Sequence, residues 1–364
     1  MTNCKRHIGI DLSKRSMQVA IMSNKNNKIL QKKFTTDLKG CQQFLRILKK
    51  DDIIGMETGN LSFELAHNII KSIGCKVNVL NAGDLQIIFR SLKKTDKEDA
   101  IKICKLINRI PEEELPLVNI PSEEEMMMRT SVGELQRLKS SRTRCLNTLH
   151  NLLWNSGYVE ATRNDMKNPQ KRTEILKELK TRYKPQADRL IKQIELLEEQ
   201  ISEVEQEQHE IMKSKIDLFE LTMSVPGVGP RVAFAIHAYM GDLSRFSNRK
   251  QVSYFTGFVP RIDNSGNQEH SGHIVNKGPN QLKGLMVQAA WSALRCKEEN
   301  AFKQFYEQIK VRRGKRIAIV AVARKMIEII FTLHKNQELF KAKNNNEKEL
   351  THTKLKKYKL VEIK

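Results

Sequence analysis

Two aspartates spaced by three residues begin an apolar helical stripe in the segment TDKEDAIKICKLI, residues 95–107. At 100° per residue, Asp96 and Asp99 share one helix face with the apolar residues Ala100, Ile103, Leu106 and Ile107. Two like charges at a buried edge repel each other and lose hydration, so they require a cation or a shared proton. A second interpretation stays open, in which Thr95 and Glu98 form a capping box and the acids serve only the helix start.

Two further acids lie on predicted strands. In RHIGIDLS, residues 6–13, Gly9 and Asp11 point to one face of the strand, and the small glycine leaves room for a ligand or a backbone. Glu57 ends the apolar run IIGME before a glycine turn. If these acids meet the helical pair, the cluster would bind two Mg²⁺ or Mn²⁺ ions about 4 Å apart, which clamp the reacting oxygens of a phosphodiester. Taken singly, each acid also fits a turn or a cap.

The composition indicates a polyanionic partner. The 364 residues carry 64 Lys and Arg against 42 Asp and Glu, a formal net charge of +22. Nucleic acid is the partner that this excess favours; a membrane surface is a weaker candidate, and a merely soluble basic protein is the remaining alternative. No apolar run is long enough to span a membrane, and the first residues lack an apolar signal core. Six scattered cysteines without a C-x-x-C pair predict free thiols in a reducing cytoplasm. A nucleic-acid partner in turn predicts association with the nucleoid in use.

The pattern along the chain predicts four regions. Residues 1–115 alternate strand and helix signals, opening with three strands, which predicts a mixed α/β sheet. Residues 116–215 combine a proline-rich linker with long helices, 216–340 form a mainly helical domain, and 341–364 a basic flexible tail.

A four-three apolar spacing runs through the middle region at Leu190, Ile194, Leu197, Ile201, Val204 and Ile211. Gln208 interrupts it where an apolar residue is due. The spacing predicts a coiled coil, within the chain or between the subunits of a dimer or tetramer. An amphipathic helix on its own globular core is the alternative. On the preceding helix the leucines face inward, whereas Arg142 and Arg144 face largely outward and are candidate nucleic-acid ligands.

The segment VPGVGPRVA, residues 225–233, places glycines directly before a helix. Gly227 and Gly229 leave backbone N–H groups open at the positive helix end, and Arg231 adds a cation, a combination that suits a phosphate. A helix-hairpin-helix motif uses such a turn for sequence-independent contacts with a nucleic-acid backbone. An ordinary turn between packed helices is equally consistent with these residues.

Several motifs together resemble a known family. GIDLSK, METGN and KTDKEDA resemble the ribonuclease-H-like fold of the RuvC type, and within it the Asp-Glu-Asp-Asp transposases of the insertion-sequence family designated one-ten. SVPGVGPRVAFAI, GFVPRIDNSG and HIVNKGPNQLKGLMVQAA resemble the C-terminal transposase domain of that family. Gly-Pro-Asn at residues 278–280, where the family has Gly-Asn, is a departure. The resemblance implies that Asp11, Glu57, Asp96 and Asp99 bind Mg²⁺.

Ser265 lies in RIDNSGN, which composition alone identifies as an exposed turn. The family resemblance implies that Ser265 is the nucleophile of a DNA recombinase, forming a phosphoserine link to donor or target DNA. It also implies a structured guide RNA encoded by the element. Nearby Arg261 and Lys277 are candidate phosphate ligands, as are Asn276 and His273, although His273 also fits a satisfied loop histidine.

Two other functions stay open. A metal-dependent resolvase or nuclease would hydrolyse DNA with water and make no use of Ser265. A non-enzymatic nucleic-acid scaffold would be built around the coiled coil and would need none of the four acids.

Overall fold

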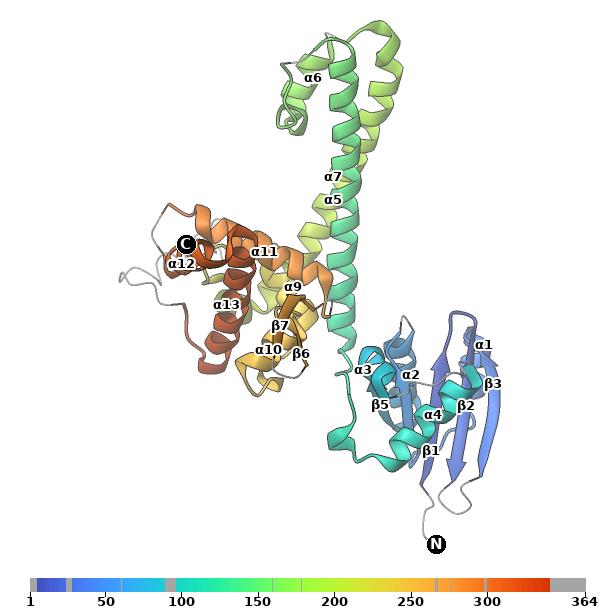
Figure 1. Ribbon diagram of the computed structural model, residues 1–364. Helices are drawn as coiled ribbons and strands as arrows, with labels where there is room; N and C mark the ends of the chain where they lie inside the picture. Colours follow the sequence, from blue (N-terminus) through green and yellow to red (C-terminus); the bar gives the residue numbers. More distant parts are fainter. Residues whose placement is uncertain are drawn as a thin grey trace. The chain divides into compact units, whose positions relative to one another are not determined.

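The computed structural model describes residues 5–23, 28–59, 61–88, 96–158, 160–177, 179–265, 268–275, 277–297 and 300–340. The chain divides into two compact units, residues 1–123 and 124–364, which are taken one at a time (Figure 1). The predicted tail at 341–364 lies outside the described residues.

A five-stranded mixed sheet forms the centre of the first unit. Its strands are β1 (Arg6–Leu12), β2 (Ser16–Ser23), β3 (Ile29–Thr35), β4 (Ile53–Glu57) and β5 (Lys76–Leu80). The order is β3-β2-β1-β4-β5; β1, β2 and β3 pair antiparallel, whereas β4 pairs parallel with β1 and β5. The predicted mixed α/β sheet, with its three opening strands, is confirmed.

Helices cover both faces of this sheet. They are α1 (Leu38–Leu45), α2 (Ser62–Ile73), α3 (Ala82–Ile88) and α4 (Asp96–Arg109). Ile8 and Ile10 of β1 pack in one cluster with Phe44 of α1 and Leu65 of α2. The other face meets α4, where Ala100 packs with residues of β2. Side chains alternate between faces along a strand, so Gly9 and Asp11 lie on the α4 side. The short α3 was not predicted.

The proline-rich segment after α4 packs on the first unit, contrary to the linker interpretation. Its first turn is η1 (Glu112–Glu114), and Leu115 is buried. The Asn81 N–H donates to the Pro116 carbonyl at 2.8 Å, and the Val118 N–H to the Val79 carbonyl at 2.7 Å. These bonds satisfy the edge of β5, so the segment belongs to the sheet domain.

Two long helices and a small cap open the second unit. They are α5 (Glu123–Asn155) and α7 (Lys184–Ser214), with η2 (Asp165–Lys167), α6 (Pro169–Lys177) and η3 (Thr181–Tyr183) between them. Ile201 and Val204 pack against Leu135, whereas Ile194 packs with Leu149, so the two helices run antiparallel side by side (Figure 1). The apolar stripe of α7 is therefore covered by α5 of the same chain. That the two helices form a coiled coil, and that they join subunits, remain predictions.

Gln208, the polar break in the stripe, is buried and donates from Nε2 to Ser131 Oγ at 2.9 Å. A buried amide is stable only when its donors find partners, so Ser131 explains why the break is tolerated.

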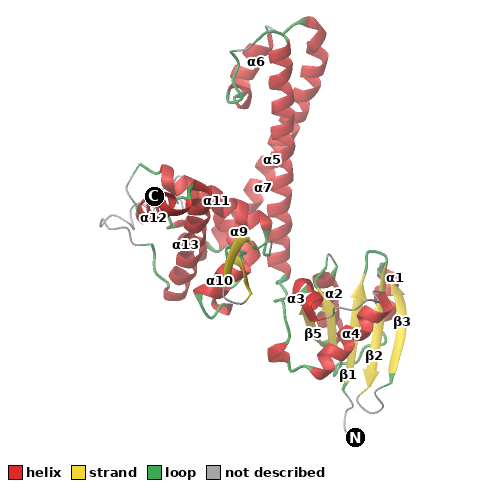
Figure 2. Ribbon diagram, viewed as in Figure 1, coloured by secondary structure: helices red, strands yellow, loops and turns green. Residues whose placement is uncertain are grey.

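The remainder of the second unit is mainly helical, as predicted. It contains α8 (Ile216–Met223), α9 (Pro230–Met240), η4 (Leu243–Arg245), α10 (Arg249–Phe255), α11 (Asn280–Arg295), α12 (Ala301–Arg313) and α13 (Lys315–Asn336). One antiparallel hairpin, β6 (Pro260–Ser265) and β7 (Gln268–Ile274), stands among the helices (Figure 2). Helix α13 supplies Val322, Met326 and Ile330 to the core. No helix in the described ranges is long and apolar enough to cross a membrane.

Candidate active site and nucleic-acid interface

Two glycines allow α4 to lie close against the sheet. A Cβ on Gly9 would overlap the Ala100 carbonyl oxygen and stand 2.8 Å from the Cys104 Cβ. A Cβ on Gly55 of β4 would stand 2.7 Å from Ile107 Cγ2. Real Cβ atoms do not come so close, so glycine is required at both positions for this helix to pack here.

Asp11 and Glu57 follow these glycines by two residues on neighbouring parallel strands. Ile10 pairs with Met56 in the register of β1 and β4, so the two acids come next at the same strand end. Because side chains alternate, Asp11 shares the face of Gly9, and Glu57 the face of Gly55. Both acids are half-buried. The sheet thus brings these two predicted site residues to one edge and one face.

Helix α4 runs opposite to β1. The Cys104 thiol donates to the His7 carbonyl at 3.1 Å, and Ala100 lies over Gly9, so the start of the helix is directed toward the strand end that carries Asp11. Burial raises the pKa of the Cys104 thiol to about 11, so this sulfur stays protonated.

The helical acids differ in their surroundings. Asp96 is exposed, whereas Asp99 is half-buried and accepts from Lys102 Nζ at 2.8 Å. A metal ion would have to compete with this ammonium for the Asp99 carboxylate.

The donor chemistry fits a hard divalent cation, since carboxylate oxygens are the ligands that Mg²⁺ and Mn²⁺ prefer. Among the described residues, no three side chains of His, Cys, Asp or Glu lie close enough together to hold a metal ion. The shared strand end brings two of the four predicted acids, Asp11 and Glu57, to one edge of the sheet.

The glycine turn of the second unit has a packing role at its first glycine. Gly227 has φ +83°, and a Cβ there would stand 2.8 Å from the Ala293 Cβ of α11. Gly229 begins α9, and its carbonyl accepts from the N–H groups of Val232 and Ala233 at 3.1 and 3.0 Å. The close approach of α11 supports an ordinary packed turn at Gly227, whereas the half-buried Gly229 and Arg231 lie at the helix start where a phosphate would bind.

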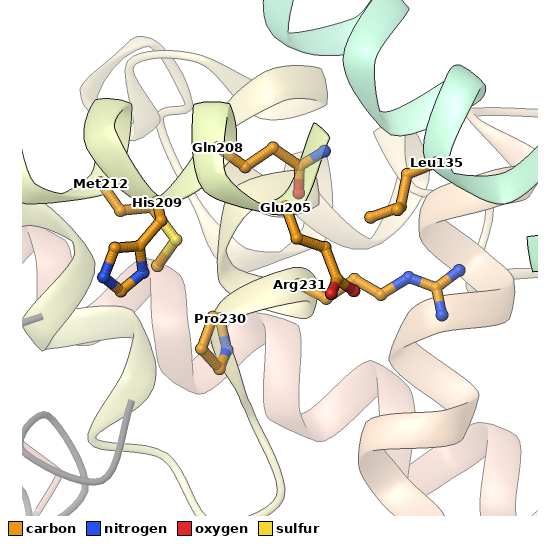
Figure 3. A pocket seen from close by; sticks show the side chains of 7 residues that line it. All are labelled: Leu135, Glu205, Gln208, His209, Met212, Pro230 and Arg231. Carbon is orange, nitrogen blue, oxygen red and sulfur yellow. The ribbon is translucent and has the colours of Figure 1, made fainter. Parts of the chain in front are cut away.

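A cavity of about 330 Å³ opens beside this helix start (Figure 3). Its walls come from α5, α7 and α9, through Leu135, Glu205, Gln208, His209, Met212, Pro230 and Arg231. Arg231 donates to Gln136, and burial lowers the pKa of its guanidinium while the nearby Glu205 carboxylate opposes that shift. Its side chain is thus engaged with α5 in this conformation.

Ser265 is the last residue of β6 and pairs with Gln268 across the hairpin end. The residues predicted to lie in a turn, up to Ser265, are therefore part of a strand. Arg261, in the same strand, is exposed. Lys277 Nζ lies 3.0 Å from the Tyr254 hydroxyl and over the Tyr254 ring, and His273 is exposed; Asn276 lies outside the described residues.

The two arginines predicted on α5 have different environments. Arg144 is exposed and donates to Ser141 Oγ at 3.0 Å. Arg142 is half-buried, and its Nε has no hydrogen-bond partner within the described part of the chain.

Sequence reasoning missed Gly55 as a site residue. The signal was present, because IGID in β1 and IGME in β4 repeat one pattern of apolar residue, glycine, apolar residue and acid. Adjacent strands with this repeat place two acids at one strand end and two glycines beneath the same helix, α4.

Comparisons with known proteins agree with this architecture. A transposase model for the Asp-Glu-Asp-Asp type of IS110 matches residues 8–156, and the model "Transposase IS116/IS110/IS902 family" matches residues 220–307. The transposase for insertion sequence element IS1111A of Coxiella burnetii is 29% identical over 254 residues, 68% of each chain. A probable family 20 transposase of Pseudomonas aeruginosa is 25% identical over 257 residues, 66% of this chain and 72% of its own. The putative transposase y4rJ of Sinorhizobium fredii is 28% identical over 285 residues, 72% of each.

The two matching transposase models and the similar transposases together identify a transposase of an insertion sequence. The chain belongs to the IS110 family of these enzymes. Membership implies a ribonuclease-H-like fold for the first unit, cleavage and rejoining of DNA, and use of a divalent metal.

Proposed function

We propose that this transposase joins DNA strands through a phosphoserine intermediate, with Ser265 as nucleophile and Asp11, Glu57, Asp96 and Asp99 as ligands of Mg²⁺ or Mn²⁺. The observation that carries the proposal is the placement of Asp11 and Glu57 at one strand end, on the face that α4 covers. In this proposal the first unit, including the segment around Pro116 that completes its sheet, is the metal-dependent catalytic domain, and residues 216–340 are the serine-bearing domain.

The chemistry follows from the groups involved. A serine hydroxyl is a weak nucleophile until its proton is removed, and a bound divalent cation supplies charge that stabilises the developing oxyanion. The Ser265 Oγ forms a bond to phosphorus as the bond from phosphorus to the leaving strand breaks, and the departing hydroxyl oxygen takes a proton. Reversal by a second strand's hydroxyl restores a phosphodiester without ATP. Because the acids and Ser265 lie in different units, cleavage requires their assembly, in one chain or between subunits of a dimer or tetramer.

Ser265 suits this role by its position at the end of β6, where pairing with Gln268 of β7 holds its backbone. Arg261 and Lys277 lie within or next to the hairpin as cations for the flanking phosphates. Gly227, Gly229 and Arg231 at the start of α9, and Arg142 and Arg144 on α5, would hold the nucleic-acid backbone elsewhere.

A guide RNA encoded by the element fits the same picture. The +22 net charge suits extensive backbone contacts. If RNA pairing selects both donor and target DNA, the protein needs no base-reading surface of its own.

The covalent intermediate is testable on a denaturing gel. Wild-type protein, copurified with its RNA, is incubated with labelled element-junction DNA and Mg²⁺, and a protein–DNA adduct is expected. Ser265→Ala and Asp11→Ala should form no adduct while retaining binding. Ser271→Ala, in the other strand of the same hairpin, is the matched control and should form adduct normally.

Two outcomes would replace the proposal. Cleavage without adduct, undiminished in Ser265→Ala, would identify a metal-dependent resolvase or nuclease that uses water. Absence of cleavage with any divalent cation, together with intact binding, would identify a nucleic-acid scaffold.

A further inference from the structure

The two long helices of the second unit carry opposite charge along their paired length. Residues 135–159, the last part of α5 and the turn after it, contain Arg137, Lys139, Arg142 and Arg144 and no Asp or Glu. Residues 193–212 of α7 contain seven Glu and no Lys or Arg. These segments lie side by side, since Ile201 packs against Leu135 and Ile194 against Leu149. The hairpin of helices therefore has one acid-free side and one acidic side.

The acid-free side presents a row of polar groups to solvent. We name this row the α5 strip: the exposed residues Arg137, Ser140, Arg144, Thr148, Asn151 and Trp154. Their spacing of three or four residues keeps them on one broad helix face, and the row is about 25 Å long at 1.5 Å per residue. Arginine, hydroxyl and amide side chains are the groups that contact nucleic-acid phosphates and sugars.

A large aromatic residue ends the strip. Trp154 is 59% exposed, and its ring is in edge contact with His150 at 6.1 Å between ring centroids. Tyr158, one turn further along the chain, is 37% exposed. An exposed indole is a platform on which an unpaired base stacks.

We infer that the α5 strip binds a single nucleic-acid strand, with phosphates along Arg137 and Arg144 and an unpaired base stacked on Trp154. The inference rests on the proposed function, in which the chain handles DNA and a guide RNA. It adds a binding surface separate from the catalytic groups. The acidic face of α7 repels the strand and confines it to α5.

A second copy of this chain is the other occupant that opposite charges allow. The strip argues against it, because stable protein interfaces have apolar centres, whereas Ser140, Thr148 and Asn151 give this face hydroxyls and amides. On α5, Trp154 comes after Leu149, the residue that packs with Ile194. Ile194 is itself at the end of the Glu-rich segment 193–212, so Trp154 lies beyond the acidic stretch. If the Glu-rich segment of a second copy paired with the arginines of the α5 strip, the Trp154 indole would have no partner in that copy.

Tryptophan fluorescence tests the inference without any cleavage step. The chain has two tryptophans, so Trp291→Phe leaves Trp154 as sole reporter. Titration with 20-nucleotide oligodeoxythymidine and with oligouridine should quench Trp154 saturably, and the two polymers distinguish a DNA strand from an RNA strand. In anisotropy titrations with labelled polymers, Trp154→Ala should weaken binding about five- to a hundredfold, and Trp154→Phe should recover most of it. Arg144→Glu should lower the slope of log affinity against log salt by about one.

Matched controls lie on the other helix. Leu196→Ala removes a large apolar side chain that is 55% exposed on α7, and Lys213→Glu makes the same charge change as Arg144→Glu. Both should bind like wild type.

Equal binding by Trp154→Ala and Leu196→Ala, or no quenching by either polymer, would overturn the inference. Quenching that follows protein concentration alone would assign the strip to a contact between copies. If the adduct forms but Trp154 is not quenched, this inference is wrong and the proposed function stands. If Trp154 is quenched but no adduct forms, the proposed function is wrong and the strip still binds nucleic acid.

Discussion

Gly9 of β1 lies directly beneath Ala100 of α4, so close that a Cβ on the glycine would overlap the Ala100 carbonyl oxygen. This contact fixes the height of the helix above the sheet. It also fixes where the first turn of α4, with Asp96 and Asp99, lies relative to Asp11 two residues beyond the glycine. The spacing between the candidate metal ligands thus depends on a residue that has no side chain.

Gly9→Ala should destabilise the first unit, because the added methyl meets backbone atoms of α4 that cannot rotate away. We expect a cost at the upper end of the roughly 1–3 kcal/mol of overpacking, and loss of DNA cleavage. Circular dichroism should show an earlier transition for this unit, whereas tryptophan fluorescence should not change, since Trp154 and Trp291 both lie in the second unit. Gly284→Ala, where a Cβ meets open space, is the control. A wild-type transition for Gly9→Ala would contradict the close packing.

Mn²⁺ binding should depend on Asp11. Replacing a carboxylate with an amide removes a charged ligand of the cation. Loss of a residue that only supports a metal ligand already lowers metal affinity about 10- to 100-fold. Asp11→Asn should therefore weaken Mn²⁺ binding by at least about tenfold. Electron paramagnetic resonance of free Mn²⁺ measures this directly. Asp217→Asn, an exposed acid of α8, should bind Mn²⁺ as wild type does. Equal affinity in the two variants would remove Asp11 from the site.

Lys102 should weaken cation binding, since its ammonium already holds Asp99. A partly exposed pair of this kind contributes about 0.2–1 kcal/mol, so Lys102→Met should lower the dissociation constant for Mn²⁺ by up to about fivefold. Lys105→Met removes an equal charge from an exposed position of the same helix and should have a smaller effect. An equal gain in both variants would show that net charge alone, and not release of Asp99, is responsible.

The sheet and its acids were predictable because their signals are local. Alternation placed Asp11 on the face of Gly9, and a 3.6-residue period placed Ala100 and Ile103 on the buried side of α4, where the structure has them. The sequence alone did not say what fills the space above Gly9. A ligand and a backbone were both consistent with it, and the answer depends on tertiary packing with α4.

The failures have physical causes in pairing between distant segments. The proline-rich stretch around Pro116 resembles a linker, yet the Pro116 carbonyl and the Val118 N–H complete the edge of β5. Asn264 and Ser265 favour turns by composition, but pairing with Glu269 and Gln268 makes them strand residues.

A buried hydroxyl between two imidazoles predicts how the second unit responds to acid. Thr222 Oγ1 lies 2.9 Å from His237 Nε2 and 2.7 Å from His334 Nε2. One hydroxyl donates to a single ring, so that ring must be neutral, and the other ring donates to the hydroxyl oxygen. Burial lowers the pKa of His237 to about 3, with the His334 and Lys215 charges adding to the effect, and burial lowers that of His334 to about 4 against the pull of Asp242.

Both histidines therefore bind protons more readily in the unfolded chain, where their pKa is near 6.5, than in the folded one. The contribution of the two neutral histidines to the free energy of unfolding is fully present above pH 6.5. It decreases as the pH drops toward 4, by up to about 1.4 kcal/mol per pH unit for each ring. Urea unfolding followed by tryptophan fluorescence between pH 7.5 and 5 measures the slope for this unit. His334→Gln keeps a hydrogen-bonding amide but cannot titrate, so its slope should be about half that of wild type. His273→Gln, at an exposed position, should leave the slope unchanged. A slope that survives His334→Gln in full would mean that other groups control the acid response.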